Sequence, residues 1–89
     1  MSSRAGAPRA DSPEVHAQLS EIVFMVTGTP VEQVSSDAAF VDDLRIDSLS
    51  MVEILEGASR HFGVRIEDEA AKDFVHMHDL VSYISRRLA

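Results

Sequence analysis

Hydrophobic residues recur at helical spacing in three long segments of the chain. Before the first segment, Ser12 and Pro13 are typical of a helix cap and a first helical position, and Gly28 follows its last apolar residue. The apolar positions in between keep a helical period: Val15, Leu19, Ile22, Val23 and Val26. The pattern therefore predicts a helix over residues 13–27.

Two further long helices are predicted, with a brief one between them. One runs from about residue 48 to residue 62 and ends at Gly63; its apolar side comprises Leu49, Val52, Leu55 and Phe62, with Ile54 and Ala58 beside them. The other covers about residues 77–88 and directs inward Leu80, Val81, Ile84 and Leu88. A brief helix over residues 67–72 begins with three acids. Because each helix is too short to be stable alone in water, these apolar stripes are expected to form the core.

The segment from residue 29 to residue 47 shows no sustained period and predicts a long loop. We expect it to be held to the core by its apolar residues, which are Val31, Val34, Phe40, Leu44 and Ile46. A connection of this length is unusual unless it is functional. The fold class is therefore all-α: a small bundle of three longer helices plus one short helix, with a long loop between the first and second helices. Residues 1–10 have no apolar period and predict a flexible N-terminal tail, which leaves residues 11–89 as the domain.

Size and composition restrict the classes of protein that fit. A chain of 89 residues allows one small domain with little room for a deep active-site cleft. It has no cysteine, which excludes disulfides and thiolate metal sites. No apolar stretch is long enough to predict a membrane span or a signal sequence. We therefore expect a cytoplasmic protein.

The formal net charge of −7 indicates the chemistry of the partners. Nucleic acid is excluded as a partner, because binding phosphates requires the opposite charge. A protein partner with lysine and arginine patches is favoured by the long-range field. The alternative is an acidic surface that serves only solubility.

The most informative motif is the stretch from Phe40 to Leu49, with Ser48 near its end. Ser48 follows an aspartate and precedes the second predicted helix, so its hydroxyl should lie at the cap or in the first turn. Backbone N–H groups without partners favour an anion such as a phosphate ester there. Negative charge that a basic surface could recognise surrounds the same position: Asp42, Asp43 and Asp47.

This stretch resembles the prosthetic-group site of acyl carrier proteins. The pattern there is an aromatic or apolar residue, then Asp-Leu, two residues, and Asp-Ser-Leu, and the similarity extends from about Val15 to Leu88. The resemblance implies that residues 11–89 form an acyl carrier domain that is not an enzyme. It also implies that a phosphopantetheinyl transferase attaches 4′-phosphopantetheine to Ser48, and that acyl groups are carried as thioesters on its thiol.

The resemblance also implies a docking surface along the second helix. Acids and apolar residues there would meet basic patches on fatty-acid or polyketide synthase enzymes; the matching positions are Asp43, Asp47, Leu49, Met51, Glu53 and Glu56. Met51 has two interpretations, an exposed contact or an inward gap filler. Arg60 interrupts the acidic run. The bundle is expected to be monomeric, and its interior could shelter an acyl chain among Val52, Leu55, Phe62, Ile66 and Leu80.

The motif departs from the common pattern at Arg45, where many family members have glycine or another small residue. The motif is most similar to actinobacterial carriers of dissociated fatty-acid or mycolic-type systems. Two alternatives remain open: a polyketide or aminoacyl/peptidyl carrier of secondary metabolism, and a helical interaction domain that is never modified.

The sequence does not favour two other chemistries, hydrolysis and metal binding. A hydrolase that used Ser48 as nucleophile would need a histidine base, and the candidates are His16, His61, His76 and His78. The chain has no Gly-x-Ser-x-Gly elbow to present such a nucleophile. His76 and His78 are two apart, which should not place them on one helix face, and spacing fixes no third ligand, so no metal site is predicted.

Overall fold

The computed structural model describes residues 12–88, so the predicted tail, residues 1–10, lies outside the described part. The elements in chain order are α1 (Pro13–Thr27), the 3-10 helix η1 (Val31–Gln33), α2 (Ser48–Phe62), α3 (Asp68–Ala71) and α4 (Met77–Leu88). Residues 12–88 contain one isolated β-bridge, between Ala39 and His76, and no longer strand. The predicted all-α bundle is confirmed, although the short helix is shorter at both ends than predicted.

The long helices begin and end where their capping residues predict. The Ser12 hydroxyl accepts a hydrogen bond from the Val15 N–H at 3.3 Å, and Pro13 is the first residue of α1. Gly28 and Gly63 end α1 and α2 with left-handed φ values of 80° and 66°, which glycine adopts without steric cost. These local signals therefore fix the lengths of both helices.

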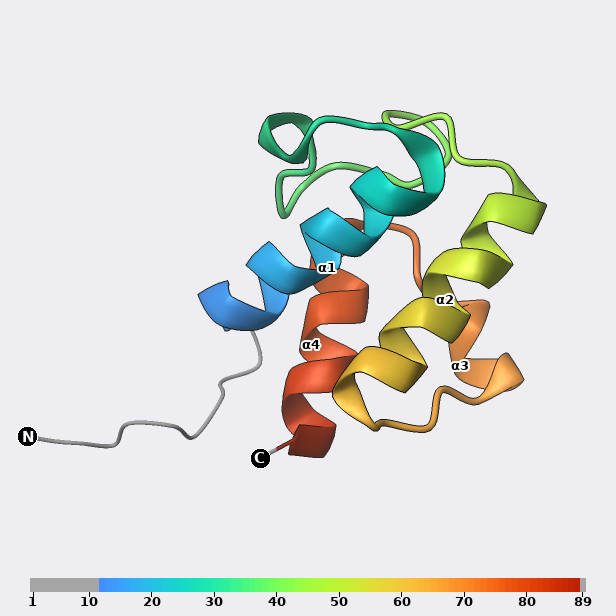
Figure 1. Cartoon of the computed structure of the whole chain (residues 1–89). Coiled ribbons are helices and arrows are strands. Elements are labelled where there is room, and N and C mark those ends of the chain that lie inside the picture. Colours follow the sequence, from blue (N-terminus) through green and yellow to red (C-terminus); the bar gives the residue numbers. More distant parts are fainter. Residues whose placement is uncertain (1–11, 89) are drawn as a thin grey trace, which may run out of the picture.

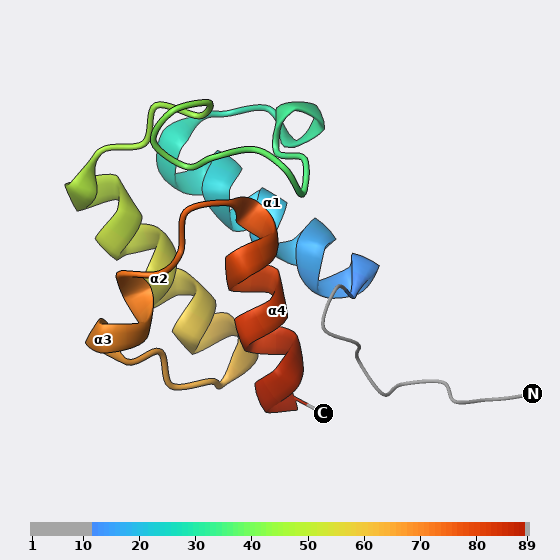
Figure 2. The same ribbon diagram turned by 180° about the vertical axis from the view of Figure 1, so that it is seen from behind.

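Helix α1 packs against both α2 and α4. Figures 1 and 2 show that the long loop crosses one end of the bundle. Helix α1 runs toward this loop end, whereas α2 and α4 both start there and run away from it (Figure 1). The start of α2, with Ser48, is consequently at the loop end of the molecule. Within the described residues, no helix is long and apolar enough to cross a membrane.

The core combines residues of the three long helices and of the loop. Its fully buried large side chains include Leu19 and Val23 of α1, Ile54 of α2, and Leu80 and Ile84 of α4. Of the five loop residues predicted to hold the loop, Val34, Phe40 and Ile46 are buried and Leu44 is partly buried; Ala38 and Ala39 are buried as well. Four apolar residues predicted to face the core are instead exposed, and these are Val31, Leu49, Val52 and Leu88.

The exposed residues of α2 have a simple geometric cause. Apolar positions extend around more of this helix than its neighbours cover. Ile54 and Ala58, one turn apart, are completely buried, whereas Leu49 and Val52 are 70% and 50% exposed. The buried stripe of α2 is therefore centred on Ile54 and Ala58, which were predicted to lie beside the apolar side of the helix. Leu49 and Val52, which were predicted to belong to that apolar side, lie partly in solvent.

Backbone hydrogen bonds hold the loop to the start of α4. The Phe40 N–H donates to the Val75 carbonyl at 2.9 Å, and the Met77 N–H donates to the Ala38 carbonyl at 2.9 Å. Within the loop, the Ile46 N–H donates to the Phe40 carbonyl, also at 2.9 Å. The sequence predicted that buried side chains hold the loop. The structure adds this network of backbone hydrogen bonds, which fixes the position of the loop segment that leads to Ser48.

Arg45 has a left-handed backbone, with φ of 59°. A side chain in this region crowds the following carbonyl, at a cost of about 1–2 kcal/mol for most residues. The Arg45 side chain is exposed. The loop therefore stores strain immediately before the Asp47–Ser48 pair.

We expect Arg45→Gly to raise the free energy of unfolding by roughly 0.5–1 kcal/mol, because glycine relieves more strain than its flexibility costs. Urea denaturation would measure the change. Arg45→Ala is the matched control, since it also removes the charge but keeps the Cβ. Equal stability of the glycine and alanine variants would show that Arg45 is not strained.

Candidate functional site

Ser48 is the first residue of α2, and its side chain is exposed. The N-cap is Asp47, whose Oδ1 accepts a hydrogen bond from the Ser50 N–H at 2.8 Å. Of the two positions predicted for Ser48, the first turn is therefore correct, and the cap belongs to the preceding residue. The Ser48 hydroxyl has no capping role that chemical modification would disturb.

Asp47 keeps a negative charge beside this hydroxyl. Hydrogen bonds from the Ser50 backbone N–H and then from the Ser50 side chain lower the pKa of Asp47 below its ordinary value. The first turn of α2 contains no further acid. The backbone N–H groups of this first turn have no hydrogen-bond partner within the helix. One of them, the Ser50 N–H, donates to the Asp47 side chain. A phosphate ester on Ser48 fits this position, since the helix dipole and free N–H groups favour an anion there.

Asp43 has a structural role that the sequence did not reveal. Its Oδ2 accepts a hydrogen bond from the Ala39 N–H at 2.7 Å, while the Asp43 N–H donates to the Ala39 carbonyl. The carboxylate therefore closes a turn within the loop. An aspartate that bonds the backbone four residues before it is a known local pattern, so the spacing of Ala39 and Asp43 is the signal that could indicate this turn.

The predicted docking residues of α2 separate into two groups. Leu49, Glu53 and Glu56 are exposed, whereas Met51 is half-buried and packs against the core. The gap-filling interpretation of Met51 is thus closer to the structure. Glu53 and Glu56 line the same groove, so they lie on one face of α2.

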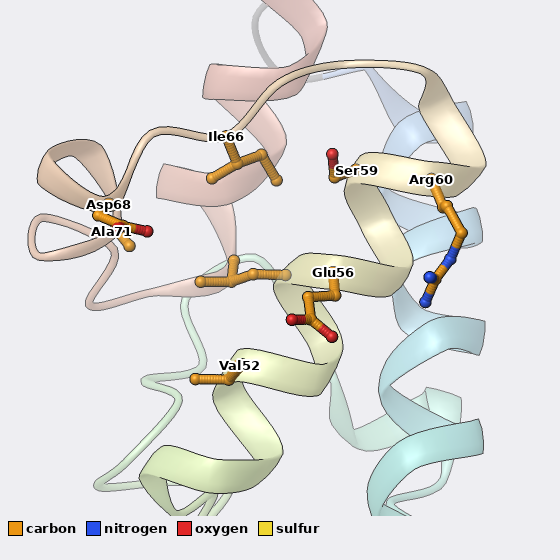
Figure 3. A pocket seen from close by; sticks show the side chains of 8 residues that line it. Val52, Glu56, Ser59, Arg60, Ile66, Asp68 and Ala71 are labelled. Atoms are coloured by element: carbon orange, nitrogen blue, oxygen red, sulfur yellow. The ribbon is translucent and has the colours of Figure 1, made fainter.

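A pocket of about 440 Å³ lies between α2 and α3 (Figure 3). Three of the residues predicted to shelter an acyl chain line it: Val52, Leu55 and Ile66. The other two do not line it, since Leu80 is completely buried and Phe62 packs against the core. Charged groups also border the pocket, and Figure 3 shows that the Arg60 side chain points away from Ile66.

His76 and His78 stack face to face, with ring centroids 5.2 Å apart and planes 6° apart. The prediction that they do not share a face is wrong. His76 precedes the first residue of α4, so its backbone is not helical and the helical spacing of side chains does not apply to it. Both Nδ1 atoms approach the Asp79 carboxylate, at 3.8 Å for His76 and 3.3 Å for His78.

Asp79 is occupied as a helix-capping group. Its Oδ2 accepts hydrogen bonds from the Val75 and His76 N–H groups at 3.0 and 2.9 Å. Partial burial alone would raise the pKa of Asp79, but these N–H donors and the nearby histidines hold it below its ordinary value. Residues 12–88 contain no group of three or more side chains arranged for a metal ion.

The histidines also have contacts of their own. His61 Nε2 lies 2.6 Å from the Gln18 side-chain oxygen, and His76 and His78 face Asp79. None of these contacts involves Ser48. The fourth histidine, His16, has a buried Nε2 without a hydrogen-bond partner, and within residues 12–88 no hydrogen bond joins a histidine to Ser48. The exposed serine at the helix start is therefore the outstanding chemical feature.

Comparisons with known proteins match most of the chain. A family model described as "Phosphopantetheine attachment site" matches residues 17–84. The acyl carrier protein of Thermobifida fusca is 44% identical over 73 residues, covering 82% of this chain and 92% of the relative. That of Renibacterium salmoninarum is 47% identical over 76 residues, covering 85% and 94%. The solved acyl carrier protein of Enterococcus faecalis superposes with a TM-score of 0.70 at 28% identity, covering 83% and 94%.

Proposed function

Because the chain belongs to the acyl carrier protein family, whose prosthetic group is 4′-phosphopantetheine, we propose that Ser48 is the attachment point. On this arm the protein carries acyl intermediates as thioesters, for fatty-acid or related lipid biosynthesis. Members of this family carry intermediates and do not catalyse reactions. The proposal includes a cytoplasmic monomer that a phosphopantetheinyl transferase modifies and that synthase enzymes then visit.

The observation that carries the proposal is the division of roles between Asp47 and Ser48. Asp47 caps α2 and stays ionised, so Ser48 is exposed at the first turn with a free hydroxyl. A bulky substituent on this oxygen extends into solvent without breaking a hydrogen bond of the fold. The arm supplies a terminal thiol for the thioester, while the first turn of α2 would stabilise its phosphate.

The pocket between α2 and α3 supports carriage of an apolar acyl group. Val52, Leu55 and Ile66 give it an apolar wall, and Val52 follows Ser48 by one helical turn. A short or partly inserted chain could exclude water here without unfolding the bundle. Longer cargo would need the bundle to open, since Leu80 and Ile54 fill the interior behind it.

Mass spectrometry tests the proposal. Incubation with a broad-specificity phosphopantetheinyl transferase and coenzyme A should add one phosphopantetheine to the intact protein. An unmodified interaction domain would keep its mass. For protein isolated from its own cells, the mass lost on hydroxylamine cleavage of the thioester would identify the cargo. A simple saturated or 3-oxygenated fatty chain would support the lipid role, whereas an aminoacyl or polyketide mass would contradict it.

Charge reversal at Glu53 or Glu56 should weaken docking to synthase enzymes. Both carboxylates are exposed and line one groove, so a basic partner patch could approach them together. We expect Glu53→Lys and Glu56→Lys to lower the transfer rate by up to roughly tenfold at low salt, mainly through association. The penalty should shrink as salt screens the charges.

Asp37→Lys is the matched control for this docking prediction. It makes the same charge change at an exposed position of the loop. Stopped-flow transfer assays at low and high salt would compare the three variants with the wild type. Equal losses in all three would mean that only net charge matters, and no docking site on α2 would be needed.

A further inference from the structure

Helix α1 presents an apolar surface at its C-terminal end, close to η1. Phe24 is 51% exposed, Met25 is 83% exposed, and Val31 of η1 is 40% exposed. A methionine side chain that is so exposed to water contributes little to the stability of the fold. We call this set, Phe24, Met25 and Val31, the α1 surface. It is separate from Ser48 and from the pocket between α2 and α3.

Met25 lies between two grooves. The first, of about 520 Å³, runs between the end of α1 and η1 and includes Phe24, Pro30 and Val31 in its wall. The second, of about 580 Å³, runs between α1 and α2 and includes Ile22 and Val26. Met25 belongs to the walls of both. A partner could therefore place apolar side chains on either side of this ridge, and the flexible methionine could adapt to them.

Carboxylates border both grooves. Glu21 and Glu32 line the first, and Glu53 and Glu56 line the second, where Arg60 and His61 are also present. The rim thus has four acids and one arginine around an apolar centre. A second copy of this chain would bring the same acids and a net charge of −7 against them. Anionic lipid headgroups would be repelled in the same way.

We propose that the α1 surface binds an amphipathic helix of a partner protein, with apolar residues along its centre and lysines or arginines along its edges. An amphipathic helix fits two apolar grooves that share Met25, because its side chains recur at i, i+3, i+4 and i+7 and so form one continuous apolar face. Basic edges are complementary to the four glutamates. Because Glu53 and Glu56 border the second groove, a partner bound here would cover part of the α2 face proposed for synthase docking, whereas Ser48 lines neither groove.

Three of the four methionines of the chain provide reporters for a direct test. Met25 reports on the α1 surface, half-buried Met51 on α2, and completely buried Met77 on the core. With methyl-labelled methionine, NMR would follow titration with a synthetic leucine–lysine peptide whose leucines lie on one helical face. A peptide of equal composition, with leucines spread around the helix, is the control.

We expect a saturable shift of the Met25 signal with the amphipathic peptide, little change at Met77, and a much weaker response to the control peptide. In the variant Glu21→Lys/Glu32→Lys, binding followed at Met25 should weaken by roughly tenfold, and more so at low salt. Phe24→Ser should also weaken it, with the melting temperature nearly unchanged because Phe24 is half-exposed.

Several results would overturn the proposal. These are an unmoved Met25 signal, equal responses to both peptides, or a Met51 shift that appears without one at Met25. A Met25 signal that depends on protein concentration would assign the surface to a second copy. Shifts on adding anionic vesicles would assign it to a membrane, and shifts caused by Arg4→Glu/Arg9→Glu without peptide would assign it to the chain's own N-terminal segment.

Discussion

Ser48→Ala is expected to abolish phosphopantetheine attachment completely and to leave the fold unchanged. The substitution removes the only atom to which the phosphate can be esterified in the motif. It does not remove the helix cap, because the Asp47 carboxylate binds the Ser50 N–H. The free energy of unfolding should therefore stay within about 0.5 kcal/mol of the wild type. Intact mass after transferase treatment measures the first effect, and thermal unfolding by circular dichroism measures the second.

Ser50→Ala is the matched control for this experiment. Ser50 is two residues further along α2, half-buried, and its backbone N–H is unaffected by the substitution. The Ser50→Ala protein should be modified normally. Modification that persists in Ser48→Ala, or disappears only in Ser50→Ala, would move the attachment point. A Ser48→Ala protein that loses about 1 kcal/mol of stability would show that Ser48, and not Asp47, caps the helix.

The largest effect on stability is expected from Ile54→Ala. Ile54 is completely buried in the core cluster. Truncating such a side chain removes its transfer free energy and leaves a cavity, which costs about 2–5 kcal/mol. In a domain of this size the melting temperature should fall by at least about 8 °C. Because small domains have only about 5–15 kcal/mol of stability, this loss threatens the folded state itself.

Val52→Ala on the same helix is the comparison that makes this result informative. Val52 has 50% of its surface exposed, so its truncation should cost well under about 1 kcal/mol. Urea unfolding of both variants would measure the difference. Similar losses of unfolding free energy in the two variants would mean that Val52 contributes to the core as Ile54 does. The buried stripe of α2 would then include Val52, as the sequence predicted.

The ends of the helices could be predicted from the sequence because they depend on local chemistry. Ser12, Pro13, Gly28 and Gly63 act through their own backbones or on residues three or four positions away. Ser48 could be found for the same reason, since its position rests on a short contiguous motif. The three-helix bundle followed from the number and length of the apolar stripes.

Other features depend on which element packs beside which, and no local pattern contains that information. The apolar stripe of α2 is broader than its contact, so only the neighbouring helices decide that Ile54 is buried and Leu49 is not. His76 and His78 stack because the chain enters α4 between them. The pocket between α2 and α3 likewise depends on where a four-residue helix lies.

The pairing of the loop with residues 75–78 has a consequence for synthesis of the protein. The Phe40 N–H and the Ala38 carbonyl obtain their hydrogen-bond partners from Val75 and Met77, which the ribosome adds well after Ser48. The loop that leads to Ser48 therefore cannot be completed while the nascent chain ends before α4. A transferase that recognises the folded loop would consequently act after translation has passed this helix, which would spare coenzyme A from use on unfinished chains.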